Sequence, residues 1–198
     1  MTDTLVQKSL SARAPGPGRP RSFDEGAALD AAMMVFWQKG FEATSLDDLT
    51  KAMGLSRSSF YGAFGCKQDL FLRAIEHYSR SGLSRLKAVA DTSDGDPVEA
   101  MMTALSNPEG GQDGCLLVNC ITELAPHDEQ VAAIGRRHLE MIEDIFAQVL
   151  DPENPDRVRD KASAYSSLAI GTLALRKAGI PAERIANTLK QARSVLSP

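Results

Sequence analysis

The sequence predicts an all-α fold of about nine helices. Apolar residues recur at helical spacing in successive blocks, and no stretch shows the strict alternation of a half-buried strand or a repeat of fixed period. The blocks are divided by turns that contain proline: Asp94–Pro97, Asn107–Pro108, Pro126, Asp151–Pro152 and Gly179–Pro181. We therefore expect an N-terminal three-helix head followed by a C-terminal helical bundle domain.

Length and composition are those of an ordinary globular protein. The chain has 198 residues, of which 43% are hydrophobic and 24% charged, enough for one domain or two small ones. Its three cysteines are too few and too scattered for a disulfide framework. Because no apolar run reaches 18 residues and the N-terminus lacks the apolar segment of a signal peptide, we expect a soluble cytoplasmic protein without membrane contact.

Charge is distributed unevenly along the chain. Residues 1–80 hold 10 Lys and Arg against 9 Asp and Glu, whereas residues 81–198 hold 12 against 17. The overall net charge of -4 therefore comes from the second part. A near-neutral head with a basic arm, followed by an acidic remainder, indicates two parts with different partners.

Regular structure is expected to begin after a flexible tail over residues 1–18, which ends in a run of alternating proline and glycine. Ser22 and Glu25 have the spacing of a capping box. Apolar residues at helical spacing follow, and Gly40 suits a left-handed exit. This pattern predicts a first helix over about 23–39.

Two short helices come next. Thr44 or Ser45 can cap the first of them and Gly54 can end it, while Ser56 caps a second over 57–63. A tight turn containing glycine between two short helices is typical of a helix-turn-helix. We therefore expect a helix-turn-helix DNA-binding domain over residues 19–79.

The rest of the chain is predicted to be helical, in a second domain over residues 80–198. A long helix over about 67–90 joins this domain to the head. The further helices are expected over about 97–106, 114–125, 128–150, 156–178 and 182–196.

The head carries a set of residues suited to DNA. A recognition helix presents small or polar side chains to a major groove about 12 Å wide, free amides at a helix start suit a phosphate, and a short basic arm suits the minor groove. Taken singly, each feature has a plainer interpretation as a cap or a solvated linker, and Phe60 is a core residue. Together they predict a DNA-binding set: Arg19, Arg21, Thr44, Ser45, Ser56, Arg57, Ser58, Tyr61 and Lys67.

The head resembles the TetR family of transcriptional regulators. The resemblance runs from Gly18-Arg19-Pro20-Arg21 through Lys39–Ser45 and Ala52–Ser56 to Ser59–Phe64 and Lys67–Leu70. It implies a homodimer that binds a palindromic operator in double-stranded DNA. It also implies a C-terminal domain with an effector pocket and a two-helix dimerisation face.

On that resemblance, the last two helices would form the dimer face. The segment 162–173 carries a stripe of small and apolar residues, which can pack closely across a two-fold axis or belong to the internal core. The residues predicted for the dimer face are Ala162, Tyr165, Ala169, Ile170 and Leu173.

The effector pocket is predicted around the segment GCLLVN at residues 114–119, which resembles one subgroup of the family. Cys115, Asn119, Thr122 and Glu123 share one helical face, and His138 can approach it. A buried Asn or Glu needs a polar partner, and a ligand is one candidate. The sequence of this segment does not identify the effector.

These observations favour a ligand-responsive transcriptional repressor. An alternative is a thiol- or metal-sensing regulator that uses Cys66, Cys115 or Cys120, because Cys66 stands at a helix start beside Lys67. Remoter alternatives are a nucleoid-type DNA binder without an effector and a thiol-redox or small-molecule enzyme with a vestigial helix-turn-helix. No catalytic Ser/His/Asp set, phosphate loop or metal-ligand spacing is present, so we expect no enzyme, no cofactor and no bound metal.

Overall fold

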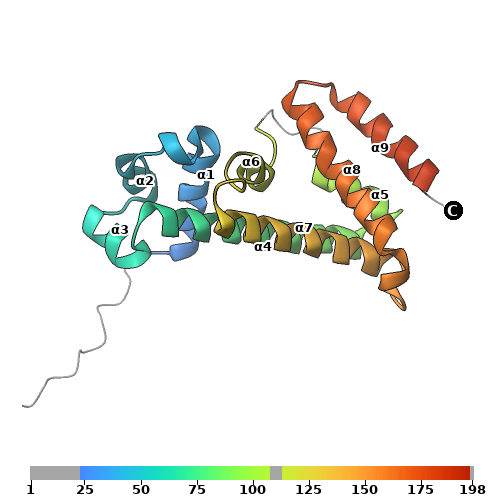
Figure 1. Ribbon diagram of the computed structural model, residues 1–198, viewed down its shortest axis with the longest axis horizontal. Coiled ribbons are helices and arrows are strands. Elements are labelled where there is room, and N and C mark those ends of the chain that lie inside the picture. Colours follow the sequence, from blue (N-terminus) through green and yellow to red (C-terminus); the bar gives the residue numbers. More distant parts are fainter. Residues whose placement is uncertain (1–22, 108–112, 197–198) are drawn as a thin grey trace, which may run out of the picture.

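The computed structural model describes residues 23–107 and 113–196, and within those ranges the chain is helical and contains no strand. The molecule is elongated, with a helical head at one end and a helical body at the other (Figure 1). The described segments form nine α-helices and one 3-10 turn: α1 (Glu25–Ala43), α2 (Leu46–Met53), α3 (Arg57–Phe64), α4 (Lys67–Thr92), α5 (Pro97–Ser106), α6 (Leu116–Glu123), α7 (Glu129–Leu150), η1 (Pro155–Val158), α8 (Arg159–Lys177) and α9 (Ala182–Leu196).

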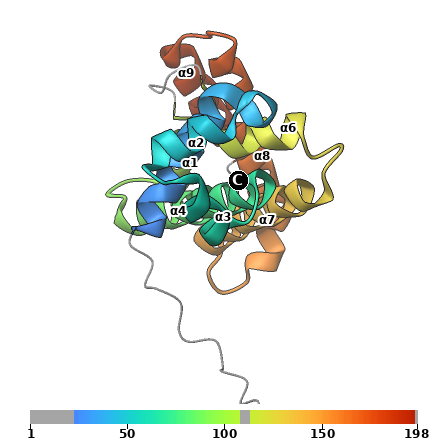
Figure 2. The ribbon, with the colours of Figure 1, turned by 90° about the vertical axis from the view of Figure 1, so that its left-hand side faces the viewer.

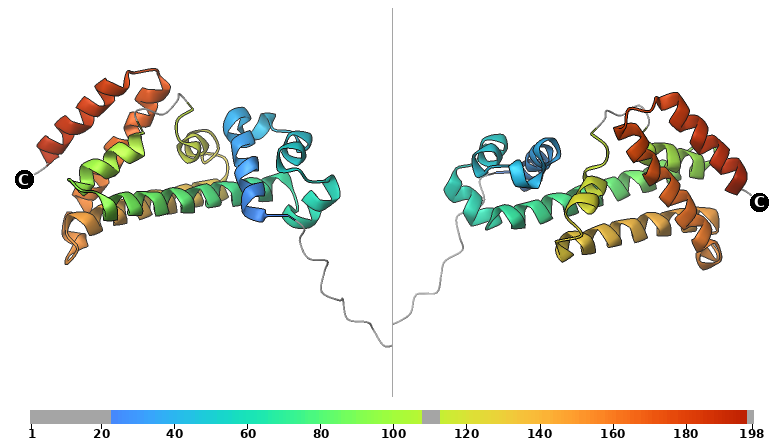
Figure 3. Two further views of the ribbon diagram at one scale, coloured as in Figure 1. Left: turned by 180° about the vertical axis from the view of Figure 1, so that it is seen from behind. Right: turned by 45° about the horizontal axis from the view of Figure 1, so that its top comes forward.

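Helix α4 joins the two ends of the molecule. Its N-terminal part packs against α1 and α3 in the head, and its C-terminal part packs against α5 in the body. Helix α7 runs beside α4, as the two views in Figure 3 agree. The predicted domain boundary between residues 79 and 80 falls inside α4, which continues without a break.

The head forms around aromatic residues. Phe36 of α1, Phe60 of α3 and Phe71 of α4 are buried, and the Phe36 and Phe71 rings meet edge to face at 5.0 Å. Leu117 of α6 joins the same cluster. Because α6 supplies part of the head's core, the head is anchored to the body by packing as well as by the continuous α4.

A second core lies in the body. Met101 of α5, Phe146 of α7, Tyr165 of α8 and Ile185 of α9 are fully buried there. The rings of Phe146 and Tyr165 stack at 6.1 Å. Figure 2, which views the molecule from the head, shows α9 at the top, and this helix packs against α5 and α8.

The ends of several helices differ from those predicted. Asp24 caps α1 by accepting a hydrogen bond from the Ala27 amide, so the predicted capping residue, Ser22, is not the N-cap, and it lies outside the described residues. Helix α1 runs on to Ala43 past Gly40, whose backbone is not helical (φ 75°, ψ 168°).

Two predicted helices in the body are shorter than expected. Gly114 has φ 72° and Cys115 is extended, so α6 begins only at Leu116. The segment predicted as one helix over 156–178 begins as the 3-10 turn η1, because Pro155 opens it, and α8 follows at Arg159.

No helix in the described ranges is long and apolar enough to cross a bilayer.

Candidate functional site

The predicted recognition helix has one buried and one exposed face. Phe60 and Phe64 of α3 are buried and fix the helix on the head, while Arg57, Ser58 and Tyr61 are exposed. Tyr61 keeps 55% of its surface in solvent although its ring edge packs on Phe60 at 5.5 Å. Three side chains with hydrogen-bonding groups therefore project from a short, firmly seated helix.

Ser56 sets the start of α3. Its hydroxyl accepts a hydrogen bond from the Ser59 amide at 3.1 Å, as an N-cap does, and donates to the Ser59 hydroxyl at 2.9 Å. The preceding helix ends at Gly54, whose backbone is left-handed (φ 64°, ψ 29°). A residue with a Cβ is strained in that conformation, so the glycine permits the tight turn between α2 and α3.

Arg57 at the first position of α3 pairs with a carboxylate of α2. Its Nη2 and Nε lie 2.7 Å and 3.2 Å from Oδ1 of Asp47. This hydrogen bond raises the pKa of Arg57 above its ordinary value. Both side chains are largely exposed, so the pair is open to exchange with another anion.

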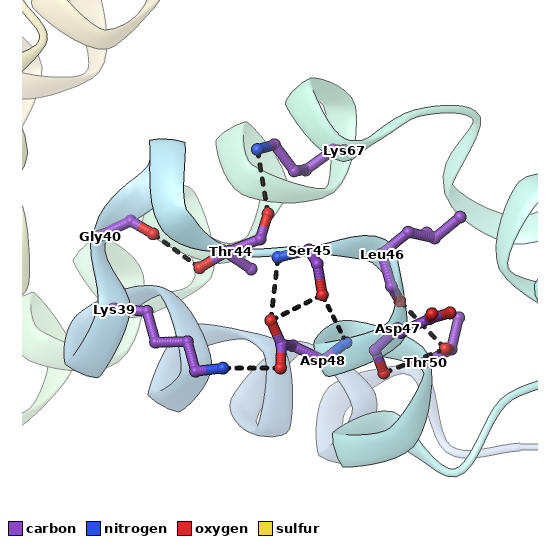
Figure 4. Close-up of polar contacts among 9 residues, drawn as sticks. All are labelled: Lys39, Gly40, Thr44, Ser45, Leu46, Asp47, Asp48, Thr50 and Lys67. Atoms are coloured by element: carbon purple, nitrogen blue, oxygen red, sulfur yellow. Dashed lines mark hydrogen bonds and ion pairs between the residues drawn. The ribbon is translucent and has the colours of Figure 1, made fainter.

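The start of α2 is closed by a capping box (Figure 4). The Ser45 hydroxyl accepts from the Asp48 amide at 3.1 Å, and Oδ2 of Asp48 accepts from the Ser45 amide at 3.0 Å. Lys39 of α1 donates to the other carboxylate oxygen at 2.6 Å. The Lys39 hydrogen bond, followed by those from Ser45, holds the pKa of Asp48 well below its usual value.

The free amides predicted at the start of α2 are not those of Thr44 and Ser45 themselves. The Thr44 amide donates to the Phe41 carbonyl at 3.3 Å, and the Ser45 amide is taken by Asp48. Thr44 itself is buried, with its hydroxyl donating to the Gly40 carbonyl. The first-turn amides that remain for an external acceptor are those of Leu46 and Asp47, since the opening amides of a helix have no intrahelical partner.

Lys67 is used inside the head. Its ammonium donates to the Thr44 carbonyl at 3.0 Å (Figure 4). It also donates to the Phe41 carbonyl at 2.9 Å and lies 4.3 Å from the centre of the Phe41 ring. The predicted phosphate contact needs a free Lys67 ammonium. In the structure this ammonium is instead hydrogen-bonded to the two carbonyls at the end of α1. Lys67 thus fixes the loop before α2. The predicted arm residues, Arg19 and Arg21, lie outside the described residues.

A cavity of about 700 Å³ lies between the head and the body. Its walls come from α1, α4, α5, α6, α7 and α8, and they include Cys115 and His138 as predicted. Asn119 does not line it, because its amide binds the Asp113 carbonyl and the Lys177 ammonium. Thr122 and Glu123 are exposed on the outside. The prediction failed for these three residues because Leu116, Leu117 and Cys120 occupy the inner face of α6.

Most of the lining residues were not predicted from the sequence, among them Trp37, Tyr78, Arg85 and Arg176. The Tyr78 hydroxyl donates to the Cys115 sulfur at 3.3 Å, and burial raises the Tyr78 pKa above its ordinary value. Trp37 packs edge to face on Tyr78 at 5.5 Å. The helical spacing of residues 78, 82, 85, 86 and 89 on one side of α4 is the signal that could have revealed this wall.

Two buried titratable groups at or near the cavity, His138 and Cys120, are neutral near pH 7. His138 Nδ1 lies 2.8 Å from the Ser79 hydroxyl, and burial lowers the His138 pKa to about 4. Burial also raises the pKa of the Cys120 thiol to about 12. Cys66, in contrast, is exposed at the N-cap of α4, where its sulfur accepts from the Asp69 amide at 3.4 Å. No group of three His, Cys, Asp or Glu side chains in the described ranges is arranged to hold a metal ion.

The stripe predicted as a dimer face lies inside the chain. Ala162, Tyr165 and Ala169 are fully buried in the body core, and the Tyr165 hydroxyl accepts from Arg193 at 2.7 Å. Ile170 and Leu173 line the cavity. The sequence pattern could not distinguish an inner from an outer face of α8, and the prediction chose the inner one. The outer face presents Ser167, Gly171 and Leu175, all exposed.

Comparison with known proteins places this geometry among regulators. The model of a family described as bacterial regulatory proteins, tetR family, matches residues 28–74. The HTH-type transcriptional regulator YezE of Bacillus subtilis (strain 168) is 34% identical over 135 residues, which span 65% of this chain and 69% of that protein. The HTH-type transcriptional repressor BdcR of Escherichia coli (strain K12) is 29% identical over 183 residues, or 89% of this chain and 90% of that protein.

Solved structures share the whole arrangement. A cysteine mutant of the TetR family transcriptional regulator CifR, in complex with 26-base-pair double-stranded operator DNA, superposes with a TM-score of 0.73 at 27% identity. The match covers 88% of this chain and 97% of that one. Reduced Escherichia coli NemR shares the fold, with a TM-score of 0.74 at 19% identity over 86% of this chain and 96% of that one.

Proposed function

Since this chain belongs to the TetR family of bacterial regulatory proteins, we propose that it is a ligand-responsive transcriptional repressor that binds a palindromic operator as a homodimer. The observation that carries the proposal is the two-faced α3. Phe60 is fully buried on one face, while Arg57, Ser58 and Tyr61 are exposed on the other. This is the form that a helix needs in order to enter a major groove.

The contacts with DNA follow from the geometry of the head. Arg57 and Ser58 at the start of α3 reach base edges or phosphates, and the Tyr61 hydroxyl reaches the backbone beside them. The amides of Leu46 and Asp47 at the start of α2 donate hydrogen bonds to a phosphate. Arg19 and Arg21 in the arm enter the adjacent minor groove. Ser56 and Lys67 position these groups, and Ser45 fixes the start of α2.

The homodimer would form through the outer faces of α8 and α9. Ser167, Gly171 and Leu175 follow one another at intervals of four residues along α8, and a Cβ built at Gly171 meets nothing within 4 Å in its own chain. Small residues at this spacing let two helices approach closely across a two-fold axis. Two heads about 34–36 Å apart would then reach successive major grooves.

The cavity is the proposed effector site. Met33 and Trp37 of α1 and Tyr78 of α4 line it together with α7 and α8 of the body, so a ligand there contacts both the head and the body. A ligand that prefers one placement of the head would shift the dimer away from the operator spacing in proportion to its differential affinity. Cys115, in the GCLLVN segment by which we assign the chain to a subgroup, also lines this cavity.

A mobility-shift titration on the DNA upstream of the protein's own gene tests the proposal. We expect a palindrome to be bound in preference to scrambled DNA, with a steep dependence on salt. Arg57→Ala should weaken binding roughly tenfold and lower the salt slope by about one, and Tyr61→Phe should also weaken it.

The matched control is Arg136→Ala, which removes an exposed arginine paired with Glu129 on α7. It should bind like wild type. If Arg57→Ala and Tyr61→Phe both retain wild-type affinity, the assigned DNA-binding face is wrong. If the protein shows no preference for the palindrome, the repressor proposal itself fails.

A further inference from the structure

Arg176 is a buried cation in the wall of the cavity. Its side chain lies at the end of α8 and only 6% of the residue's surface is exposed. Nη1 donates to the carbonyls of Ser106 and Asn107 at 2.9 Å and 2.5 Å, at the C-terminal end of α5. These two bonds use one nitrogen of the guanidinium and tie α8 to α5.

Among the described residues, the other edge of this guanidinium has no acceptor. Nε is buried without a hydrogen bond, and Nη2 donates to none of the described residues. No carboxylate in the described ranges lies within ion-pair distance of Arg176, although exposed arginines such as Arg57 and Arg159 have such partners. A buried charge without a counter-ion is costly, and so is a buried N–H without an acceptor.

The charge of the remaining cavity wall does not compensate Arg176. Asp30 is the one carboxylate among the described residues that line the cavity, and it lies 3.0 Å from His77 Nε2. Arg85 adds a second guanidinium, and the buried His138 is neutral near pH 7. The wall therefore carries two arginines against one carboxylate. Most of the other lining side chains are apolar, among them Leu86, Leu105, Val118, Ile142 and Leu173.

We propose that this cavity binds an amphipathic small molecule with one carboxylate, which pairs with the free edge of Arg176 while its apolar body lies among the leucine, valine and isoleucine side chains. Nε and Nη2 lie along one edge of the planar guanidinium, and that pair of donors matches the two oxygens of a carboxylate. The ligand both neutralises the buried charge and satisfies the buried N–H. A volume of about 700 Å³ lies within the usual range for small-molecule sites.

The binding of a carboxylate in the cavity does not depend on the proposed function. Only the role of that molecule as the effector rests on it. The binding step can be measured without DNA. Trp37 is the single tryptophan of the chain and lines the cavity, so its fluorescence reports occupancy directly. The probes are two matched pairs, decanoate with 1-decanol and 4-phenylbutyrate with 4-phenyl-1-butanol, titrated at micromolar concentrations together with a thermal-shift measurement.

We expect each carboxylate to bind at least tenfold more tightly than its alcohol, to change the Trp37 emission and to raise the melting temperature. Arg176→Gln should abolish this preference while the alcohol's affinity stays within about twofold. Because Arg176 also ties α5 to α8, a second variant, Ile170→Trp, keeps the arginine and narrows the cavity instead. In the thermal-shift measurement, which the added tryptophan does not disturb, it should lose the response to both members of each pair.

Equal affinity of carboxylate and alcohol for the wild type, including no binding of either, overturns the inference. Wild-type carboxylate affinity in a folded Arg176→Gln variant overturns it as well. Operator release is measured separately. If the carboxylates bind but leave the operator complex intact, the ligand class stands and the effector role fails.

Discussion

The guanidinium of Arg57 is held against the carboxylate of Asp47, with Nη2 and Nε both within 3.2 Å of the same oxygen. The pair links the first residue of α3 to the first turn of α2, so it orients Arg57 across the turn of the helix-turn-helix. It also places a negative charge beside the face that we assign to DNA. Since both groups are well exposed, the pair itself adds little to stability.

Removing the charge of Asp47 is expected to strengthen DNA binding. In wild type, Arg57 must leave the Asp47 carboxylate in order to bind a DNA phosphate, and the Asp47 charge repels that phosphate. Asp47→Asn removes both effects. We expect operator affinity to rise roughly threefold at physiological salt, measured by fluorescence anisotropy, an effect that salt screens. Asp144→Asn, which breaks the exposed pair with Arg159 in the body, is the control and should bind like wild type. A loss of affinity in Asp47→Asn would show that the pair's orienting role outweighs its charge.

The outer face of α8 is expected to hold the dimer together. Gly171→Arg places a long charged side chain where the chain itself offers open space, so the monomer should fold normally and fail to pair. Sedimentation velocity should show the mass falling to that of one chain, 21.3 kDa. Gly95→Arg, at an exposed turn that is also free of neighbours, should remain dimeric. A dimeric Gly171→Arg protein would place the interface elsewhere.

Acid should destabilise the protein through His138. In the unfolded chain this histidine takes up a proton below about pH 6.5, whereas burial holds its pKa in the folded chain at about 4. This group therefore leaves the free energy of unfolding unchanged above about pH 6.5. As the pH falls from about 6.5 to about 4 it lowers that free energy, by about 2 kcal/mol at pH 5.

The measurement is urea unfolding at pH 7.5 and pH 5. His138→Gln should lose about 2 kcal/mol less than wild type between the two values, because the groups common to both proteins cancel. His127→Gln, which replaces an exposed histidine, should keep the wild-type pH dependence. The same loss in wild type and His138→Gln would mean that His138 is readily protonated in the folded chain.

The thiols should react in an order set by burial. Cys66 is exposed, Cys115 is half-buried behind the Tyr78 hydroxyl, and the buried Cys120 thiol has its pKa raised to about 12. Brief treatment with N-ethylmaleimide at pH 7.5 is expected to label Cys66 first and leave Cys120 intact, as mass spectrometry would show. Labelled wild type should bind operator more weakly, since Cys66 lies between α3 and α4, and treated Cys66→Ser should not. Labelling of Cys120 as fast as Cys66 would contradict the order.

Local signals were sufficient to predict most helices. Ser56 and Gly54 define the turn between α2 and α3 through their own side chain and backbone, without help from distant residues. The segments 97–106 and 182–196 were predicted with the bounds that the structure has. At α1 the prediction placed the cap at Ser22 because Ser22 and Glu25 have the spacing of a capping box, but Asp24 takes that role.

Which side of a helix faces inward was harder to predict. The stripe of Ala162, Tyr165 and Ala169 is apolar enough for either an interior or an interface, and contacts with α5, α7 and α9 bury it within one chain. Lys67 looked free in the sequence, yet the carbonyls of Phe41 and Thr44 receive its ammonium. Partners so far apart in sequence leave no local pattern.

The sequence by itself determined that the chain is helical, that residues 45–64 form a helix-turn-helix, and which of its side chains are polar enough to meet DNA. These properties depend on capping, glycine conformation and periodicity, which act over a few residues. Only the tertiary structure decided that α1, α4, α5, α6, α7 and α8 line one cavity and that Arg176 lies in its wall with one edge unpaired among the described residues. Burial and charge compensation are set by residues brought together from the whole chain, as when Ser106 and Asn107 meet Arg176 about 70 residues later.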